Sequence, residues 1–503
     1  MSLNCSYKDI TWSEYSLSKT ESTSCDTDMI VPDAKSDIAK IISAKGDAYV
    51  LNSDCTNGRV TINGEVKFNV LYIGDEDSGR INSITKSAPF SLVTSCPDAA
   101  ENITTIAEVC SSSCSVSLVN SRRLRVSASV VLSIICCKTM QKSALVSAEG
   151  AQSISRDVKL TSMQLITKKE LSLSESLDLP TGKSPITEIL RSSASVTSYE
   201  TKVLNNKLVI KGNILASILY LSDSAISEAA IEMPFTEVVD AEGVSPLFKT
   251  NVKVSSSECD ITPDTDLSGE YKMVNISLVL DVIITSSKEE AVTLITDAYL
   301  PRGAVKKEIE TIVLQSLSDD IREEEFVKDS LPLTKGLPPI LRVFDSCCSL
   351  SEISFDPESG VASGFAEVTI LYISSDPAAP IASFSSKVAF NHKTMVENAE
   401  NVKADSCHLS YSVVSNDNVD VRLNIRFLVT EADKESISFF TSLEEGKYEP
   451  MDRASIIISF ATDTDSVWDI AKRHNIPVND LISANALSPD APLKKGEKLI
   501  IPR

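Results

Sequence analysis

The clearest structural pattern in the chain is Thr61-Ile-Asn-Gly-Glu-Val-Lys-Phe-Asn-Val-Leu-Tyr72. Apolar and polar residues alternate along it, and this period of two predicts a β-strand with one buried and one wet face. Gly64 lies eight residues before Tyr72, on the buried side of the pattern. We interpret it as a point of close packing, because a glycine inside a strand leaves room for a neighbouring backbone or side chain.

The same fingerprint, a glycine followed eight residues later by the tyrosine of a Leu-Tyr-apolar triplet, occurs three times. Its tyrosines, Tyr72, Tyr220 and Tyr372, stand 148 and 152 residues apart, so each repeat is a whole domain, longer than a solenoid unit of about 20–50 residues. Each repeat continues with a phenylalanine on a second predicted strand and closes with a β-rich stretch: Phe90 and 124–135, Phe235 and 274–284, Phe390 and 421–429. Short strands separated by polar turns predict sandwich-like, mainly-β domains.

A short segment before each fingerprint strand has helical spacing. Residues 35–42 and 183–190 place apolar side chains three and four positions apart, and residues 336–343 are a looser third copy. Ser36 and Ser184 stand where they could cap a helix, and Pro185 fits a first helical position. We therefore expect one small helix in each of three repeats strung along the chain, with boundaries at 1–150, 151–302 and 303–450.

A different module is predicted after a polar linker at residues 444–450. Residues 456–460 form a predicted strand, and Thr464-Asp-Ser466 can cap a helix over 467–474. A second helix over 478–484 and a closing strand within 496–502 follow. The expected result is a small α+β (βααβ) module at residues 455–503.

The composition limits the kinds of partner. The chain has 503 residues, 42% of them hydrophobic, and a formal net charge of −22. Such a charge disfavours nucleic acids and anionic lipid surfaces, and it is compatible either with simple solubility or with a basic protein partner. No secretory signal pattern opens the sequence, and no run reaches the about 18–20 apolar residues of a transmembrane helix. We expect an intracellular protein that does not insert into a membrane.

The twelve cysteines predict reduced, buried thiols, because the chain is large and lacks an export signal. Cys110-x-x-x-Cys114 resembles half a zinc site, but no second half accompanies it. The adjacent pairs Cys136-Cys137 and Cys347-Cys348 would point to opposite faces of a strand and could not readily share a metal. We expect no metal and no cofactor.

Catalytic patterns are also missing from the sequence. The three histidines, His392, His408 and His474, lie in unrelated contexts. Thr181-Gly-Lys-Ser184 imitates the end of a phosphate-binding loop without its earlier glycine, and we interpret it as a helix start. Cys407 and His408 are neighbours, and neighbours on a strand diverge, so they do not suggest a nucleophile and base. These patterns indicate a non-enzymatic protein and disfavour a hydrolase.

The C-terminal segment resembles a LysM domain. Asp465-Ser-Val-Trp-Asp-Ile-Ala471 is similar to the family's Asp-Thr-Leu-x-x-Ile-Ala, Asn485 matches its helix-ending asparagine, and Gly496 to Pro502 matches its ending. Thr464 stands where the family usually has glycine, in the loop that would border a sugar groove. Trp468 is open to two interpretations, as a half-buried core residue or as an exposed contact residue.

The three repeats resemble the SPOCS domains of clostridial spore coat morphogenetic proteins, through the proline, short segment, strand and Gly-x7-Tyr arrangement. This resemblance implies a mother-cell scaffold or adaptor of the spore coat at the forespore surface, with the coat-basement ATPase and other coat proteins as partners and the LysM module as the docking end. The alternative is a protein of the spore cortex or envelope that binds peptidoglycan or a chitin-like N-acetylglucosamine glycan. The resemblance assigns partner or glycan binding to Thr464, Asp465, Ser466, Trp468, Lys472, Asn485, Leu487 and Ser488.

Overall fold

The computed structural model describes residues 3–75, 80–96, 103–223, 225–317, 321–377, 379–447, 457–488 and 493–502. The first unit consists of two three-stranded antiparallel sheets packed face to face around one apolar core. We call them the outer sheet, with strand order β1-β6-β5, and the inner sheet, with order β2-β3-β4. Their strands are β1 (Asn4–Ile30), β6 (Arg123–Glu149), β5 (Ile103–Asn120), β2 (Ile38–Thr56), β3 (Arg59–Gly74) and β4 (Ile81–Ser95).

The second and third units repeat this arrangement. In the second, the outer sheet is β7 (Gln152–Asp178), β12 (Met273–Tyr299) and β11 (Lys249–Asp264), and the inner sheet is β8 (Glu188–Leu204), β9 (Lys207–Ser222) and β10 (Ala225–Asp240). In the third, β19 (Asn418–Gly446) pairs with β13 (Ala304–Leu317), β14 (Ile321–Pro332) and β18 (Ala399–Ser415). Its inner sheet is β15 (Ile340–Asp356), β16 (Val361–Ser374) and β17 (Ile381–Lys393). The domain boundaries drawn from the sequence stay a prediction.

The fingerprint glycines lie where an aromatic ring crosses the inner sheet. Gly64, Gly212 and Gly364 pair with Phe90, Phe235 and Phe390 of the next strand. A Cβ at Gly212 would lie 2.5 Å from the Ser198 carbonyl oxygen and 2.8 Å from the Phe235 ring. Because atoms cannot approach so closely, each position requires glycine for packing, as the sequence pattern predicts.

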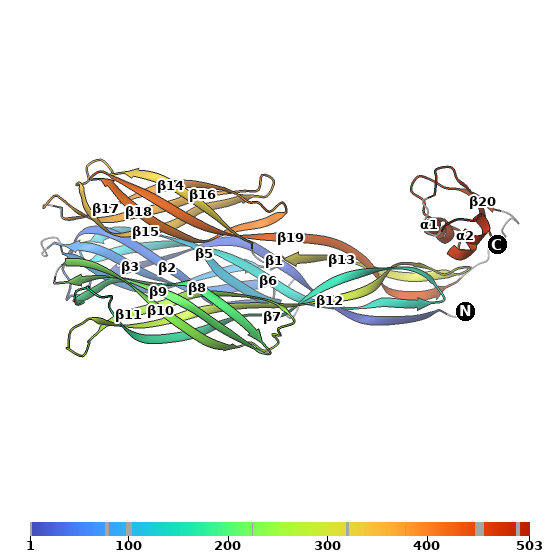
Figure 1. The fold of residues 1–503 in the computed structure, drawn as a ribbon, viewed down its shortest axis with the longest axis horizontal. Helices are drawn as coiled ribbons and strands as arrows, with labels where there is room; N and C mark the ends of the chain where they lie inside the picture. Colours follow the sequence, from blue (N-terminus) through green and yellow to red (C-terminus); the bar gives the residue numbers. More distant parts are fainter. Residues whose placement is uncertain are drawn as a thin grey trace.

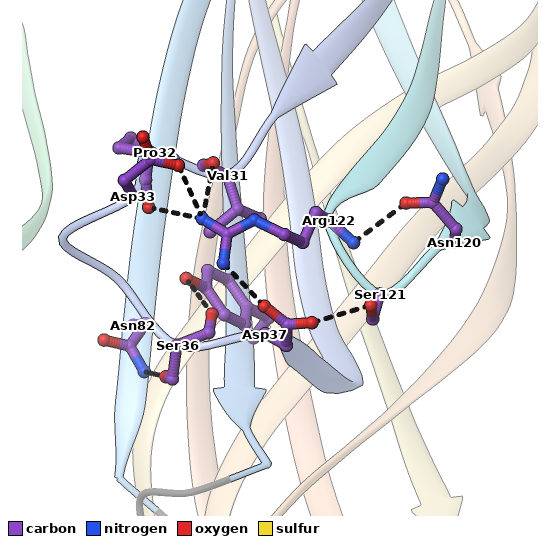
Figure 2. Close-up of polar contacts among 10 residues, drawn as sticks. Val31, Pro32, Asp33, Ser36, Asp37, Asn82, Asn120, Ser121 and Arg122 are labelled. Carbon is purple, nitrogen blue, oxygen red and sulfur yellow. Dashed lines mark hydrogen bonds and ion pairs between the residues drawn. The ribbon is translucent and has the colours of Figure 1, made fainter.

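No helix forms before the fingerprint strand in any unit within the described residues, and the prediction of one was wrong. In the first unit, Figure 2 shows residues 31–37 as a turn held by Arg122. The Arg122 guanidinium donates to Asp37 Oδ1 at 2.6 Å and to the Pro32 carbonyl at 3.1 Å, and the Tyr72 hydroxyl donates to the Ser36 carbonyl at 3.2 Å. Thr181–Ser184 of the second unit likewise lies in a turn leading to β8 and does not start a helix.

The helical spacing comes from β-bulges. The pairing register shifts between Ile38 and Lys40 and again between Ile41 and Ser43. A bulge adds one residue to a strand and so changes which side chains share a face. As a result, Ile38 and Ile41 both contact the core of their own unit, whereas Ile42 lies on the other face of the sheet. The same pattern recurs at Ile186, Ile189 and Leu190 and at Ile340, Val343 and Phe344.

A second apolar core joins the three units, which surround it instead of following one another in a line (Figure 1). The leucine of each Leu-Tyr-apolar triplet belongs to it (Leu71, Leu219, Leu371), while the tyrosine beside it points into its own sandwich. Neighbouring strand residues face opposite sides, so the triplet serves two cores at once. The second face of the fingerprint strand, expected to contact solvent, is therefore buried at this leucine.

Polar residues at matching positions connect the units beside this core. Ser43, Arg191 and Asp345 each pair in their sheets with the leucine of the triplet. Arg191 is buried, and its guanidinium donates to Asp345 Oδ2 at 2.9 Å and to Ser43 Oγ at 3.1 Å. One residue from each unit thus takes part in an ion pair with an added hydrogen bond, and these contacts tie the three units together.

The outer strands continue beyond the sandwiches into a narrow stem (Figure 1). They are far longer than the short strands that the sequence predicts: β1, β6, β7 and β12 have 27 residues each. Three two-stranded ribbons, β1–β6, β7–β12 and β13–β19, pack around a stem core that contains Trp12, Leu160 and Phe439. Bulges at Tyr15/Leu17 and Ser286/Ser287 mark the passage from body to stem in two ribbons.

Candidate functional site: the C-terminal module on the tip of the stem

The C-terminal module has the βααβ order that its sequence predicts. Its elements are β20 (Ile457–Phe460), α1 (Val467–Arg473), α2 (Val478–Asn485) and β21 (Lys498–Ile501), with residue 456 outside the described part. β20 pairs with β21, and both helices cover an apolar core containing Ile470, Leu481 and Leu499. Residues 444–446, expected in a linker, are the end of β19, and 448–450 lie outside the described residues.

The loop before α1 is fixed by the residues predicted from the sequence. Ser466 caps α1 in a capping box with Asp469, whose carboxylate accepts from the Ser466 backbone N–H at 2.9 Å. Asp465 accepts from the Thr462 N–H at 2.9 Å and pairs with Arg473, and these contacts lower the pKa of its carboxyl group. Asp465 and Ser466 therefore shape the loop, whereas Thr464 is exposed.

The loop after α2 is held in a similar way. Asn485 donates to the Leu481 carbonyl at 2.9 Å and to the Ile500 carbonyl at 2.7 Å, and it accepts from the Ile500 N–H at 2.6 Å. Its side chain thus joins the end of α2 to the last strand. Leu487 packs against the module core, and Ser488 is exposed. Among the predicted site residues Thr464, Ser466 and Ser488 are exposed, and Ser466 is engaged in the cap of α1.

The face of α1 that carries Trp468 and Lys472 is covered by the stem. Both side chains converge on Asp297 near the end of β12: the Trp468 indole donates at 2.7 Å, and the Lys472 ammonium donates to both carboxylate oxygens at 2.6 Å. Burial favours a raised pKa for Asp297, but the hydrogen bonds from Lys472 and Trp468 outweigh it and lower the pKa. The carboxylate is therefore charged in this contact.

Tyr299, at the last position of β12, completes the contact. Its ring meets the Trp468 ring edge to face with centroids 5.0 Å apart, and its hydroxyl donates to the Ile476 carbonyl at 2.8 Å. Tyr299 is 4% exposed and belongs to the apolar core of the module. Beyond it, the Arg302 N–H donates to the Asn475 carbonyl at 2.8 Å. The module is thus seated on the tip of the stem, opposite the three-unit body (Figure 1).

Trp468 is half-buried at the module core, as the first of its two interpretations predicts, and its indole contacts Asp297 of its own chain. Its role as a contact residue for a partner stays a prediction. Asp297 and Tyr299, the partners of this face, are not predicted from the sequence. They lie 171 and 169 residues before Trp468, on a strand whose sequence shows only β periodicity. No local signal could have indicated them.

The catalytic candidates do not gather into a site. His392 is buried between Glu323, 2.7 Å from its Nε2, and Glu325, 3.0 Å from its Nδ1, and it stacks on Phe427. This cluster joins β17 to β14 in the interior of the third unit. In the described part of the chain, no group of three or more His, Cys, Asp and Glu side chains could hold a metal ion, and no helix is long and apolar enough to cross a membrane.

Comparison with known families agrees with this architecture. The family model of the SipL, SPOCS domain matches residues 37–119 and 185–263, and that of the LysM domain matches residues 464–502. The chain carries SipL-type SPOCS domains and a C-terminal LysM domain. SPOCS and LysM are non-catalytic domain families, and this combination is that of sporulation proteins. Comparisons with curated proteins and with solved structures gave no match.

The third unit lies outside the residues matched by the SPOCS family model, yet it repeats the contacts of the two SPOCS units. The N–H groups of Ile38, Ile186 and Ile340 donate to the carbonyls of Ser121, Tyr271 and Asn416 at 2.7, 2.8 and 2.7 Å. The Tyr372 hydroxyl donates to the Pro338 carbonyl at 2.9 Å, as Tyr72 and Tyr220 donate to the carbonyls of Ser36 and Ser184. The third unit therefore has the same fold as the two matched units.

Proposed function

We propose that this protein is a non-enzymatic scaffold of spore coat assembly. In this proposal it works in the mother cell at the forespore surface, where the LysM module docks to the coat-basement ATPase and the SPOCS body binds other coat proteins. The SPOCS and LysM domain families support a role in sporulation, and the identities of the partners are part of the proposal.

The observation that carries the proposal is the separation of two surfaces on one elongated molecule. Three units of the same fold surround a common core at one end, and the LysM module is seated on the stem at the other (Figure 1). Several similar units presented together can hold partners more strongly than one unit alone, because binding at a second site becomes intramolecular. A stem of three packed ribbons keeps the two ends apart.

Docking of a partner through Trp468 and Lys472 requires α1 to leave the stem. Both side chains are engaged by Asp297, so a partner reaches them only after this contact opens. Docking through α1 therefore competes with the stem. A ligand of the loops carrying Thr464 and Ser488 does not compete in this way, because these side chains are exposed while the module is seated.

The exposed loops favour glycan binding as the second candidate function. LysM modules are glycan-binding domains, and the two open loops are those that would border a sugar chain. In this alternative the protein acts at the cortex or envelope and holds peptidoglycan while α1 stays on the stem.

Removing residues 455–503 tests the scaffold proposal. We expect the shortened protein to remain folded but to lose recruitment to the forespore surface, observed with a fluorescent fusion in sporulating cells. Normal recruitment of the shortened protein would contradict the docking role. Calorimetric titration of the full chain with N-acetylglucosamine oligomers distinguishes the scaffold from the glycan-binding alternative. For the scaffold we expect weak binding of the oligomers. Tight binding, together with normal recruitment of the shortened protein, would favour the glycan function.

A further inference from the structure

Two cysteine thiols of the third unit face each other across its sandwich. Cys348 lies on β15 of the inner sheet, Cys407 lies on β18 of the outer sheet, and their sulfur atoms are 3.2 Å apart. Both side chains pack at the apolar core of the unit. All twelve cysteines of the chain are free, so this pair is a reduced dithiol.

The backbone geometry at this level suits a covalent link. The residue of the first unit that corresponds to Cys348 is Gly46 on β2. Cys348 pairs with Val368, and Gly46 pairs with Phe68. Val368 and Phe68 each lie four residues after the fingerprint glycine of their unit. On the facing strand the place of Cys407 is taken by Ser112 of β5, whose hydroxyl donates to the Gly46 carbonyl at 2.8 Å. A Cβ at Gly46 would lie 3.3 Å from the Cβ of Cys114, two residues further along β5. Disulfides have Cβ atoms about 3.5–4.5 Å apart, so inner and outer sheets approach closely enough here for a link without large movement. Only the third unit has a thiol on both sides.

The pair is accessible to a small reagent. Cys348 and Cys407 line a cavity of about 410 Å³ between the first and third units, together with Cys110, Cys114 and Cys347. Burial raises the pKa of the thiols of Cys110, Cys114 and Cys347, which keeps them protonated and poorly nucleophilic. Cys407 differs, because the hydrogen bond with Cys348 lowers its pKa.

We propose that Cys348 and Cys407 are a peroxide-sensitive dithiol that closes to a disulfide and joins the two sheets of the third unit. The oxidant is hydrogen peroxide, which is small enough for a half-buried site. The Cys407 thiolate attacks one peroxide oxygen, the O–O bond breaks, and the leaving hydroxide takes a proton to become water. Cys348 then attacks the sulfur of the resulting sulfenic acid. The S–S bond forms, the S–O bond breaks, and the hydroxide released takes the Cys348 proton as the second water.

The disulfide would close a loop between residues 59 positions apart and restrict the unfolded chain. It forms only where peroxide is present and thiols are not kept reduced, as in a compartment exposed after cell lysis. The third unit would then become harder to unfold while its fold stays the same. This inference does not depend on the partner bound by the LysM module.

Peptide mapping of the full-length protein tests the proposal. After mild peroxide treatment and trypsin digestion without reductant, we expect peptides 343–387 and 404–422 to appear joined, with a mass two hydrogen atoms below their sum. Cys348→Ala and Cys407→Ala should abolish the link. Cys347→Ala, within the same peptide, and Cys114→Ala, in the same cavity, are matched controls that should keep it.

Melting curves give a second measurement. Peroxide should raise the melting temperature of the wild type, a reductant should reverse this rise, and Cys407→Ala should not show it. A link that persists in Cys348→Ala, or oxidation of Cys407 to its sulfinic acid without any link in the wild type, would overturn the proposal.

Discussion

Gly212 tests whether the fingerprint glycines are needed for packing. Valine there would place its Cβ 2.5 Å from the Ser198 carbonyl oxygen and close to Phe235, so β8 or the ring would have to move. We expect Gly212→Val to lower the free energy of unfolding by about 1–3 kcal/mol. Asn213→Val is a matched control, because Asn213 is the exposed neighbour on the same strand. Equal denaturant midpoints for the two variants would show that the inner face at Gly212 is open.

Asp297 gives the LysM contact a pH dependence of known sign. Its pKa is lowered in the folded protein, so the contact is fully present above the ordinary carboxyl pKa of about 3.9 and is lost as the pH falls through the lowered value. The Trp468 indole N–H, one of two indole signals of the chain, should report this by NMR with a midpoint below about 3.9. In Asp297→Asn that titration should disappear. A midpoint above the ordinary value in the wild type would contradict the charged contact.

Elements that depend on local sequence patterns could be predicted, whereas bulges and contacts between distant segments could not. Alternation identified the fingerprint strand, and capping and apolar spacing identified α1, because local patterns determine these elements. The segment from Ile38 to Ile42 was misread, since a bulge reproduces the three-and-four spacing of a helix. Leu71 is apolar although it lies on the face of the fingerprint strand that was expected to contact solvent. This residue was the one available signal for the shared core. The seating of Trp468 on Asp297 joins distant segments and has no local signature.

Leu190 tests the bulge at the scale of the element. Its side chain is 1% exposed and contacts the shared core, whereas Ile189, one residue earlier, packs on its own unit. We expect Leu190→Ala to cost about 2–5 kcal/mol and to loosen the association of the three units as well as the second unit itself. Hydrogen exchange should therefore rise in the inner sheets of all three units. Faster exchange confined to β8 to β10 would show that the shared core does not couple them.

Arg191 and Asp345 join the second and third units in the whole molecule. Replacing Arg191 by methionine leaves the Asp345 carboxylate without its ion-pair partner, and we expect a loss of about 3–5 kcal/mol. The double variant Arg191→Met with Asp345→Leu should regain much of this loss, since two apolar side chains fit beside the shared core. Independent, additive effects in denaturant unfolding would contradict the pairing.

The most direct test of the scaffold account compares how strongly the coat-basement ATPase binds three forms of the full chain. Trp468→Ala with Lys472→Glu removes the α1 face, whereas Asp297→Asn leaves that face intact and weakens its contact with the stem. Titration of each form with the purified ATPase should show binding lost in the double variant and strengthened in Asp297→Asn, because the stem competes less. Wild-type affinity in the double variant would contradict the claim that this protein docks through its LysM helix.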